Sequence, residues 1–140
     1  MPDTGDVARV LRVDSANTDD LARVHPWLDA ETRHLPVAMR HGMGVALEEV
    51  VMNVTMHGGS SGAITVVMVS STDAATLIVE DSGRAFDPTA APAQEPPTSL
   101  ADARPGGLGL ILLRHYCKDI SYARVGERNR LTLRFPLMPG

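Results

Sequence analysis

The sequence has little or nothing of several features, and each absence excludes a class of protein. It contains a single cysteine, Cys117, which cannot form an internal disulfide and fits a reducing cytosol. No run of Lys or Arg exceeds two residues and the formal net charge is −4, so the chain lacks the basic surface that displaces counterions from nucleic acid. We therefore expect a cytoplasmic protein that does not bind DNA or RNA directly.

Long apolar segments are also missing. The longest apolar-rich run, residues 63–69, is far too short to cross a bilayer. The opening residues MPDTGDVARV have neither a basic region nor a continuous apolar one, so we expect no signal peptide and no membrane association. The chain of 140 residues is 44% hydrophobic and 21% charged, which suits a single domain over residues 1–140.

The order of apolar patterns and turn residues predicts an α+β fold. Strands are expected at residues 7–13, 63–71, 75–81, 119–125 and 130–136, the last two around a turn at 126–129. Helices are expected over about 19–33 with a kink or restart at Pro26, from Pro36 to about His57, and from Gly106 onward. This order favours a two-layer sandwich, a mostly antiparallel sheet covered on one face by helices.

One segment interrupts this order. Residues 87–105 hold five prolines in 19 residues and few large apolar side chains. Such a long segment without regular structure is unusual inside a compact domain and is often functional. We expect a mobile lid over about residues 87–106.

The helix from Pro36 to His57 carries a polar line beside its apolar stripe. Glu49, Asn53 and His57 are spaced by four and so lie along one face. Asn is a mediocre helix former, so Asn53 calls for an explanation beyond packing. Its amide oxygen is a ligand that Mg²⁺ accepts beside phosphates and waters, and Glu49 can serve as a general base. Taken alone, the spacing is more often a solvated polar face.

Two further stretches carry possible binding chemistry. In VEDSGRAF, residues 79–86, the carboxylate of Asp81 at a strand end can accept a hydrogen bond from an exocyclic amine, and Gly83 leaves room for a flat ring. In GGLGL, residues 106–110, free amides at a helix start can bind phosphate, although no Walker Gly-Lys-Ser/Thr follows. Alone, the first is more often a simple turn, and the second is equally a plain helix start.

Together, the three motifs resemble the ATP-binding superfamily of gyrase, heat-shock chaperones, histidine kinases and mismatch-repair ATPases. Residues 49–53 resemble its N box, 81–86 its first glycine box and 107–110 its second, with the lid between the last two. Within the superfamily, nearly the whole chain most resembles the bacterial anti-sigma factor serine/threonine kinases. The resemblance implies the histidine kinase-like ATPase (Bergerat) fold.

The resemblance also implies roles for single residues. Asn53 corresponds to the Mg²⁺ ligand, Glu49 to the catalytic base and Asp81 to the acceptor of the adenine amine, which selects ATP over GTP. The other residues implied to contact the nucleotide are His57, Gly83, Phe86, Arg104, Gly107, Leu108, Gly109, Leu110 and Thr132. Three of these have simpler explanations that stay open: His57 as a helix cap, Arg104 as a solvated charge and Thr132 as a strand former.

By resemblance, the protein is an anti-sigma factor and serine/threonine kinase that uses ATP and Mg²⁺. It would bind a sigma factor in one state and phosphorylate an anti-anti-sigma (STAS-domain) protein in the other, as a homodimer. One alternative is a nucleotide-dependent binding module without kinase activity, which Glu49 argues against. Another is a stand-alone histidine kinase catalytic domain, disfavoured because the chain has no room for a phosphoacceptor hairpin.

Overall fold

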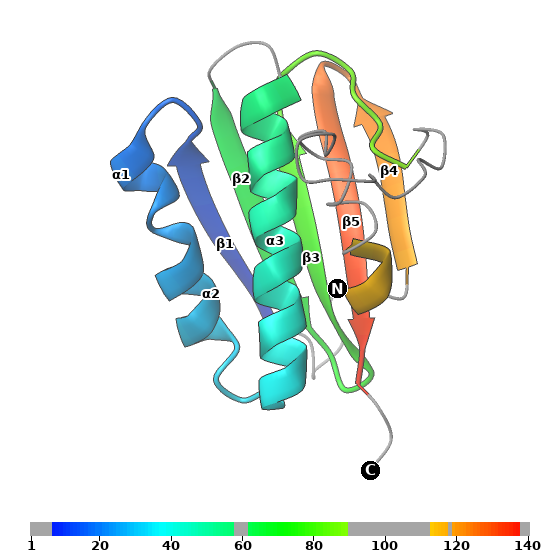
Figure 1. Ribbon diagram of the computed structural model, residues 1–140. Coiled ribbons are helices and arrows are strands. Elements are labelled where there is room, and N and C mark those ends of the chain that lie inside the picture. The colour runs from blue at the N-terminus through cyan, green and yellow to red at the C-terminus, as the bar shows by residue number, and fades with distance from the viewer. Residues whose placement is uncertain (1–6, 58–61, 90–112, 118, 138–140) are drawn as a thin grey trace, which may run out of the picture.

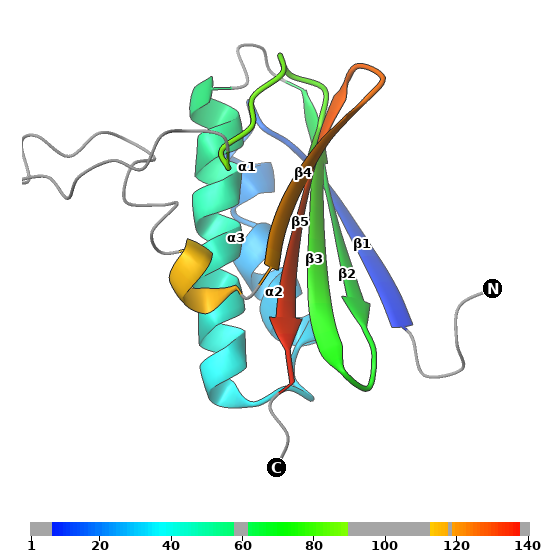
Figure 2. The ribbon, with the colours of Figure 1, turned by 90° about the vertical axis from the view of Figure 1, so that its right-hand side faces the viewer.

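The computed structural model describes residues 7–57, 62–89, 113–117 and 119–137. Five antiparallel strands form one sheet in the order β1–β2–β3–β5–β4 (Figure 1). They are β1 (Val7–Asp14), β2 (Ala63–Ser70), β3 (Ala74–Asp81), β4 (Asp119–Val125) and β5 (Arg128–Pro136). The helices α1 (Thr18–Leu21), α2 (Val24–Glu31) and α3 (Val37–His57) all lie on one face of this sheet (Figure 2). The predicted two-layer α+β sandwich is confirmed.

The helix boundaries follow local chemistry. Asn17 caps α1, since its side-chain oxygen accepts a hydrogen bond from the amide of Asp20 at 3.1 Å. The predicted helix over 19–33 is divided into α1 and α2. Pro26 lies in the first turn of α2, where a backbone N–H would have no partner within the helix, so its absence costs no hydrogen bond. Pro36 directly precedes α3, and its carbonyl accepts from the amide of Arg40 at 3.0 Å. Proline therefore restarts a helix here rather than kinking it.

The last two strands meet in a shorter turn than expected. Gly126 has a φ of 61°, and with Glu127 it forms a two-residue turn that pairs Val125 with Arg128. A positive φ matches the twist that tight hairpins need, and glycine adopts it without strain. Strand β5 therefore begins two residues before the predicted start, and Asn129, which we expected in the turn, is part of the strand.

The core lies between α3 and the inner face of the sheet. Alternate residues of the central strands face the helices, as period-two strands require. The apolar stripe predicted on α3 is buried as well, with Val54 partly covered. Buried side chains from these elements include Leu47, Val50, Val51, Ile64, Val66, Leu77, Val79, Leu131 and Leu133. Each such burial contributes roughly 1.5–3 kcal/mol, which fixes α3 over the strands that carry the polar residues described below.

A short helical segment at residues 113–116 packs against α3 (Figure 2). Leu113 is fully buried, and the ring of Tyr116 lies so close to Gly42 of α3 that a Cβ there would come within 2.8 Å of Tyr116 Cδ1. Of the predicted lid, residues 87–89 are within the described part. Among the helices of the described ranges, none has the length and apolar character needed to cross a membrane.

Candidate nucleotide site

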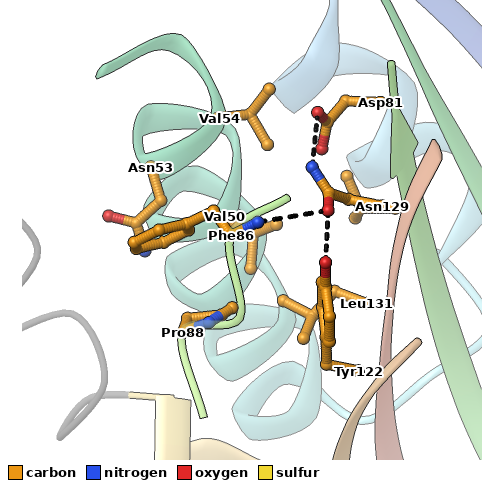
Figure 3. Close-up of a pocket in the computed structure, with 10 residues that line it drawn as sticks. Val50, Asn53, Val54, Asp81, Phe86, Pro88, Tyr122, Asn129 and Leu131 are labelled. Atoms are coloured by element: carbon orange, nitrogen blue, oxygen red, sulfur yellow. Dashed lines mark hydrogen bonds between the residues drawn. The ribbon is translucent and has the colours of Figure 1, made fainter. Parts of the chain in front are cut away.

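Two of the three predicted motifs meet at a small pocket between α3, the end of β3 and the start of β5 (Figure 3). The cavity has a volume of about 30 Å³, with a mostly apolar lining. It is lined by Val50, Asn53, Val54, Val79, Asp81, Phe86, Pro88, Tyr122, Asn129 and Leu131. Asn53 and Asp81, which the sequence places on separate motifs, thus share one site.

Asp81 is the polar centre of this pocket. It is the last residue of β3 and faces the helices, in alternation with Leu77 and Val79, so its carboxylate is buried. A buried carboxylate is costly without hydrogen bonds. Its Oδ1 accepts two, from the amide of Gly83 at 2.9 Å and from Asn129 Nδ2 at 3.1 Å. No described residue donates to Oδ2, so this oxygen can accept from a bound amine.

Gly83 and Phe86 shape the turn after β3. Gly83 is buried and its carbonyl accepts from Arg124 Nη1 at 2.7 Å, so the turn is tied to β4. The side chain of Phe86 is 37% exposed and lines the pocket with Pro88. Phe86 therefore forms part of the pocket wall and is not a core residue.

Asn53 occupies the opposite wall. It is 8% exposed, yet its side-chain amide makes no hydrogen bond with any residue of the described ranges. The polar atoms of this amide are not enclosed, so they are open to water or to a ligand. In Figure 3 the oxygen of Asn53 points away from Asp81 and Asn129. An amide oxygen that is open to a ligand suits Mg²⁺, whose other ligands are phosphates and waters. The residues present therefore fit a magnesium–nucleotide complex.

Glu49 lies one helical turn before Asn53 and is partly buried. Burial raises the pKa of its carboxyl group, and the like charge of Glu48 raises it further. A carboxylate with a raised pKa is a stronger base, as proton abstraction requires. Glu48 itself is exposed, and its Oε2 lies 3.8 Å from His25 Nε2.

Asn129 is a site residue that the sequence analysis missed. It is 6% exposed, lines the pocket and pairs in register with Asp81 across β3 and β5. The signal was present in NRLTLRF, where Asn129 alternates with Leu131 and Leu133 on the core face. Assigning Asn129 to a four-residue turn hid this alternation. Tyr122 and Arg124 of β4, which bond to Asn129, were missed with it.

Thr132 requires a correction. Successive side chains of a strand point to opposite faces of the sheet. Since Leu131 and Leu133 face the helices, Thr132 lies on the outer face with Arg130 and does not reach the pocket. Its explanation as a strand former is the one that the structure favours.

The remaining predicted contacts are not tested by this geometry. His57 ends α3, but its side chain lies outside the described residues. Arg104 and the second glycine motif, Gly107, Leu108, Gly109 and Leu110, lie outside them too. Their proposed contacts with phosphate stay predictions.

Comparisons with known proteins find a family model and a relative that each match much of the chain. A family model described as the histidine kinase-like ATPase domain matches residues 14–135, a span that includes all three motifs. The chain is also 35% identical over 98 residues to the serine/threonine-protein kinase BtrW of Bordetella bronchiseptica. That alignment covers 68% of this chain and 69% of the relative.

Proposed function

The chain belongs to the family of histidine kinase-like ATPase domains, and we propose that it is a serine/threonine protein kinase that uses ATP and Mg²⁺. The observation that carries this proposal is the pocket in which Asp81 and Asn53 meet, with Glu49 one turn away on α3. The similarity to a serine/threonine kinase favours transfer to a protein hydroxyl over simple ATP hydrolysis.

The adenine base would lie against the apolar lining of the pocket. Val79 and Leu131 provide an apolar floor, and Asp81 Oδ2 accepts from the amino group of the base. The triphosphate then extends toward Asn53 and the predicted second glycine motif at residues 107–110. Free amides at that helix start suit phosphate oxygens.

Asn53 would hold Mg²⁺, which neutralises the charge that develops on the transferred phosphoryl group. Glu49 accepts the proton of a serine or threonine hydroxyl as the hydroxyl oxygen bonds to the γ-phosphorus. The bond between the γ-phosphorus and its bridging oxygen breaks, and ADP leaves with that oxygen. The chain contributes position and a proton acceptor, as this reaction requires.

We further propose that this kinase acts in the cytoplasm as an anti-sigma factor. In one state it binds a sigma factor, and in the other it phosphorylates an anti-anti-sigma (STAS-domain) protein. The form of the three motifs supports this assignment. We also propose a homodimer, which is compatible with β1 being an edge strand whose backbone can pair with a second copy.

Capture from native cytosol tests the proposal. The tagged protein is incubated with the extract and Mg·ATP, and the captured proteins are identified by mass spectrometry. We expect a sigma factor and a small partner that gains phosphoserine or phosphothreonine only when ATP is present. A partner held stably and never phosphorylated would instead establish the nucleotide-dependent binding module.

A further inference from the structure

The buried amide of Asn129 connects the pocket carboxylate to two neighbouring elements. Its Nδ2 donates to Asp81 Oδ1 at 3.1 Å and to the carbonyl of Arg84 at 2.8 Å. Both acceptors lie on β3 or on the turn that follows it. Both N–H groups of the amide therefore have a hydrogen-bond acceptor.

The oxygen of the same amide faces donors. It accepts from the amide of Phe86 at 3.3 Å and from the hydroxyl of Tyr122 (Figure 3). It also accepts from Arg124 Nη1 at 3.1 Å. Arg124 Nη1 also donates to the carbonyl of Gly83 at 2.7 Å, which links the arrangement to the glycine turn. Strand β4 thus supplies two side chains, Tyr122 and Arg124, that both donate to Asn129 Oδ1.

These bonds permit one orientation of the amide. Rotating Asn129 by half a turn about its last side-chain bond would set its NH₂ group against the N–H groups of Arg124 and Phe86. It would also set its oxygen against the carboxylate of Asp81. Both exchanges replace hydrogen bonds by repulsions, so the NH₂ group is held toward Asp81.

The fixed orientation makes the two oxygens of Asp81 inequivalent. Oδ1 accepts from Asn129 and Gly83, while Oδ2 accepts from no residue of the described ranges. A carboxylate held in this way presents an acceptor to the pocket. Such an acceptor pairs with the 6-amino group of adenine and repels the 6-carbonyl oxygen of guanine.

We propose that Asn129, held by Tyr122 and Arg124, is a positioning residue that directs Asp81 Oδ2 toward the 6-amino group of the purine and so selects ATP. This inference rests on the proposed nucleotide-binding function. It assigns base selectivity to a residue outside the three motifs.

The test compares two nucleotides that differ only at this amino group. The affinities for ATP and for purine riboside triphosphate, which has hydrogen in place of the amine, are measured by isothermal titration calorimetry. The wild-type protein is expected to bind ATP about tenfold more tightly or better, the usual contribution of a hydrogen bond to a charged group. Asn129→Ala should lose this preference, binding ATP as weakly as the analogue while its affinity for the analogue stays unchanged. Arg128→Ala, an exposed neighbour on the same strand, should retain the full preference.

The outcomes separate positioning from general structural support. The inference is overturned if Asn129→Ala lowers the affinities for both nucleotides equally. It is also overturned if the variant keeps the full preference for ATP. Should Asn129→Ala fail to fold by circular dichroism, Tyr122→Phe decides, because it removes one donor to Asn129 and keeps the ring. Tyr122→Phe is expected to lose part of the preference, and an unchanged preference there overturns the inference. Wild-type protein that binds neither nucleotide overturns the proposed function itself, a result distinguishable before any variant is made.

Discussion

Glu48 and Glu49 are neighbours on α3, but Glu48 projects into solvent and Glu49 is partly buried on the side of Asn53. Consecutive helical residues diverge by about 100°, so two adjacent acids can have separate roles. The pair provides a matched control for the proposed mechanism.

Glu49→Ala is expected to bind ATP normally and to lose phosphoryl transfer. A general base contributes roughly a hundredfold or more to such a step, so the rate with saturating partner should fall by at least that factor. Transfer is measured with radiolabelled ATP and the captured partner, and Glu48→Ala is the control that should retain activity. Transfer at the normal rate in Glu49→Ala would show that the base is another residue.

Glu48→Gln should shift the pH dependence of transfer without removing activity. The negative charge of Glu48 raises the pKa of Glu49, so removing that charge lowers the pKa. A base with a lower pKa stays deprotonated to lower pH, and the acid limb of the kcat profile should move toward acid. Glu31→Gln, on α2, is a control for loss of a surface acid. A shift toward higher pH would contradict the proposed influence of Glu48 on the base.

Asn53→Ala should abolish the contribution of Mg²⁺ to nucleotide affinity. The amide oxygen of Asn53, in the pocket lining, is the group that we propose as the Mg²⁺ ligand. ATP affinity is measured in Mg²⁺ and again in excess chelator, and the variant is expected to give the same value in both. Asn53→Asp keeps an oxygen ligand and should retain the difference. If Mg²⁺ increased the ATP affinity of Asn53→Ala as much as that of the wild type, Asn53 would be excluded as the metal ligand.

Two glycines of α3 should respond to alanine in opposite directions. A Cβ at Gly44 meets no atom within 4 Å, so Gly44→Ala should stabilise the protein by up to about 1 kcal/mol through helix propensity. A Cβ at Gly42 comes within 2.8 Å of the ring of Tyr116, so Gly42→Ala should destabilise by about 1–3 kcal/mol. Urea unfolding measures both changes. Stabilisation by Gly42→Ala would mean that the 113–116 segment does not pack against α3.

Cys117 should be inert in the folded protein. Burial raises the pKa of its thiol from 9.0 to about 12. Because the thiolate is the reactive form, this shift lowers its population at pH 8 by about a thousandfold. Labelling with a thiol reagent should be slow in buffer and fast in concentrated urea. Rapid labelling under native conditions would show that the helix ending near Cys117 opens readily.

The overall fold was predictable because its signals are local. Period-two strands, the cap at Asn17 and the two prolines fix where elements begin and end, and the structure follows them to within two residues. The family was predictable for a related reason. Three motifs in a fixed order are specific even though each is weak alone, and the family model that matches residues 14–135 confirms the family.

The contacts within the pocket were less predictable. Asn129 was missed because one turn was taken as four residues long. Thr132 was placed in the site by resemblance, although its neighbours Leu131 and Leu133 are the residues that face the helices. The partners of the Asn129 side chain come from β3, from the turn after β3 and from β4, so no single stretch of sequence carries the arrangement. Such long-range hydrogen bonds emerge only once the strands are paired.

The turn at Gly126 and Glu127 must keep its length of two residues for Asn129 to face the pocket. If one residue were inserted there and the turn stayed two residues long, β5 would slide by one position against β4 and exchange its two faces. Thr132 would then face the helices, and Asn129 would be on the outer side of the sheet, with every motif residue still in place. In related sequences, an insertion at this hairpin should therefore signal loss of adenine selectivity more reliably than many substitutions.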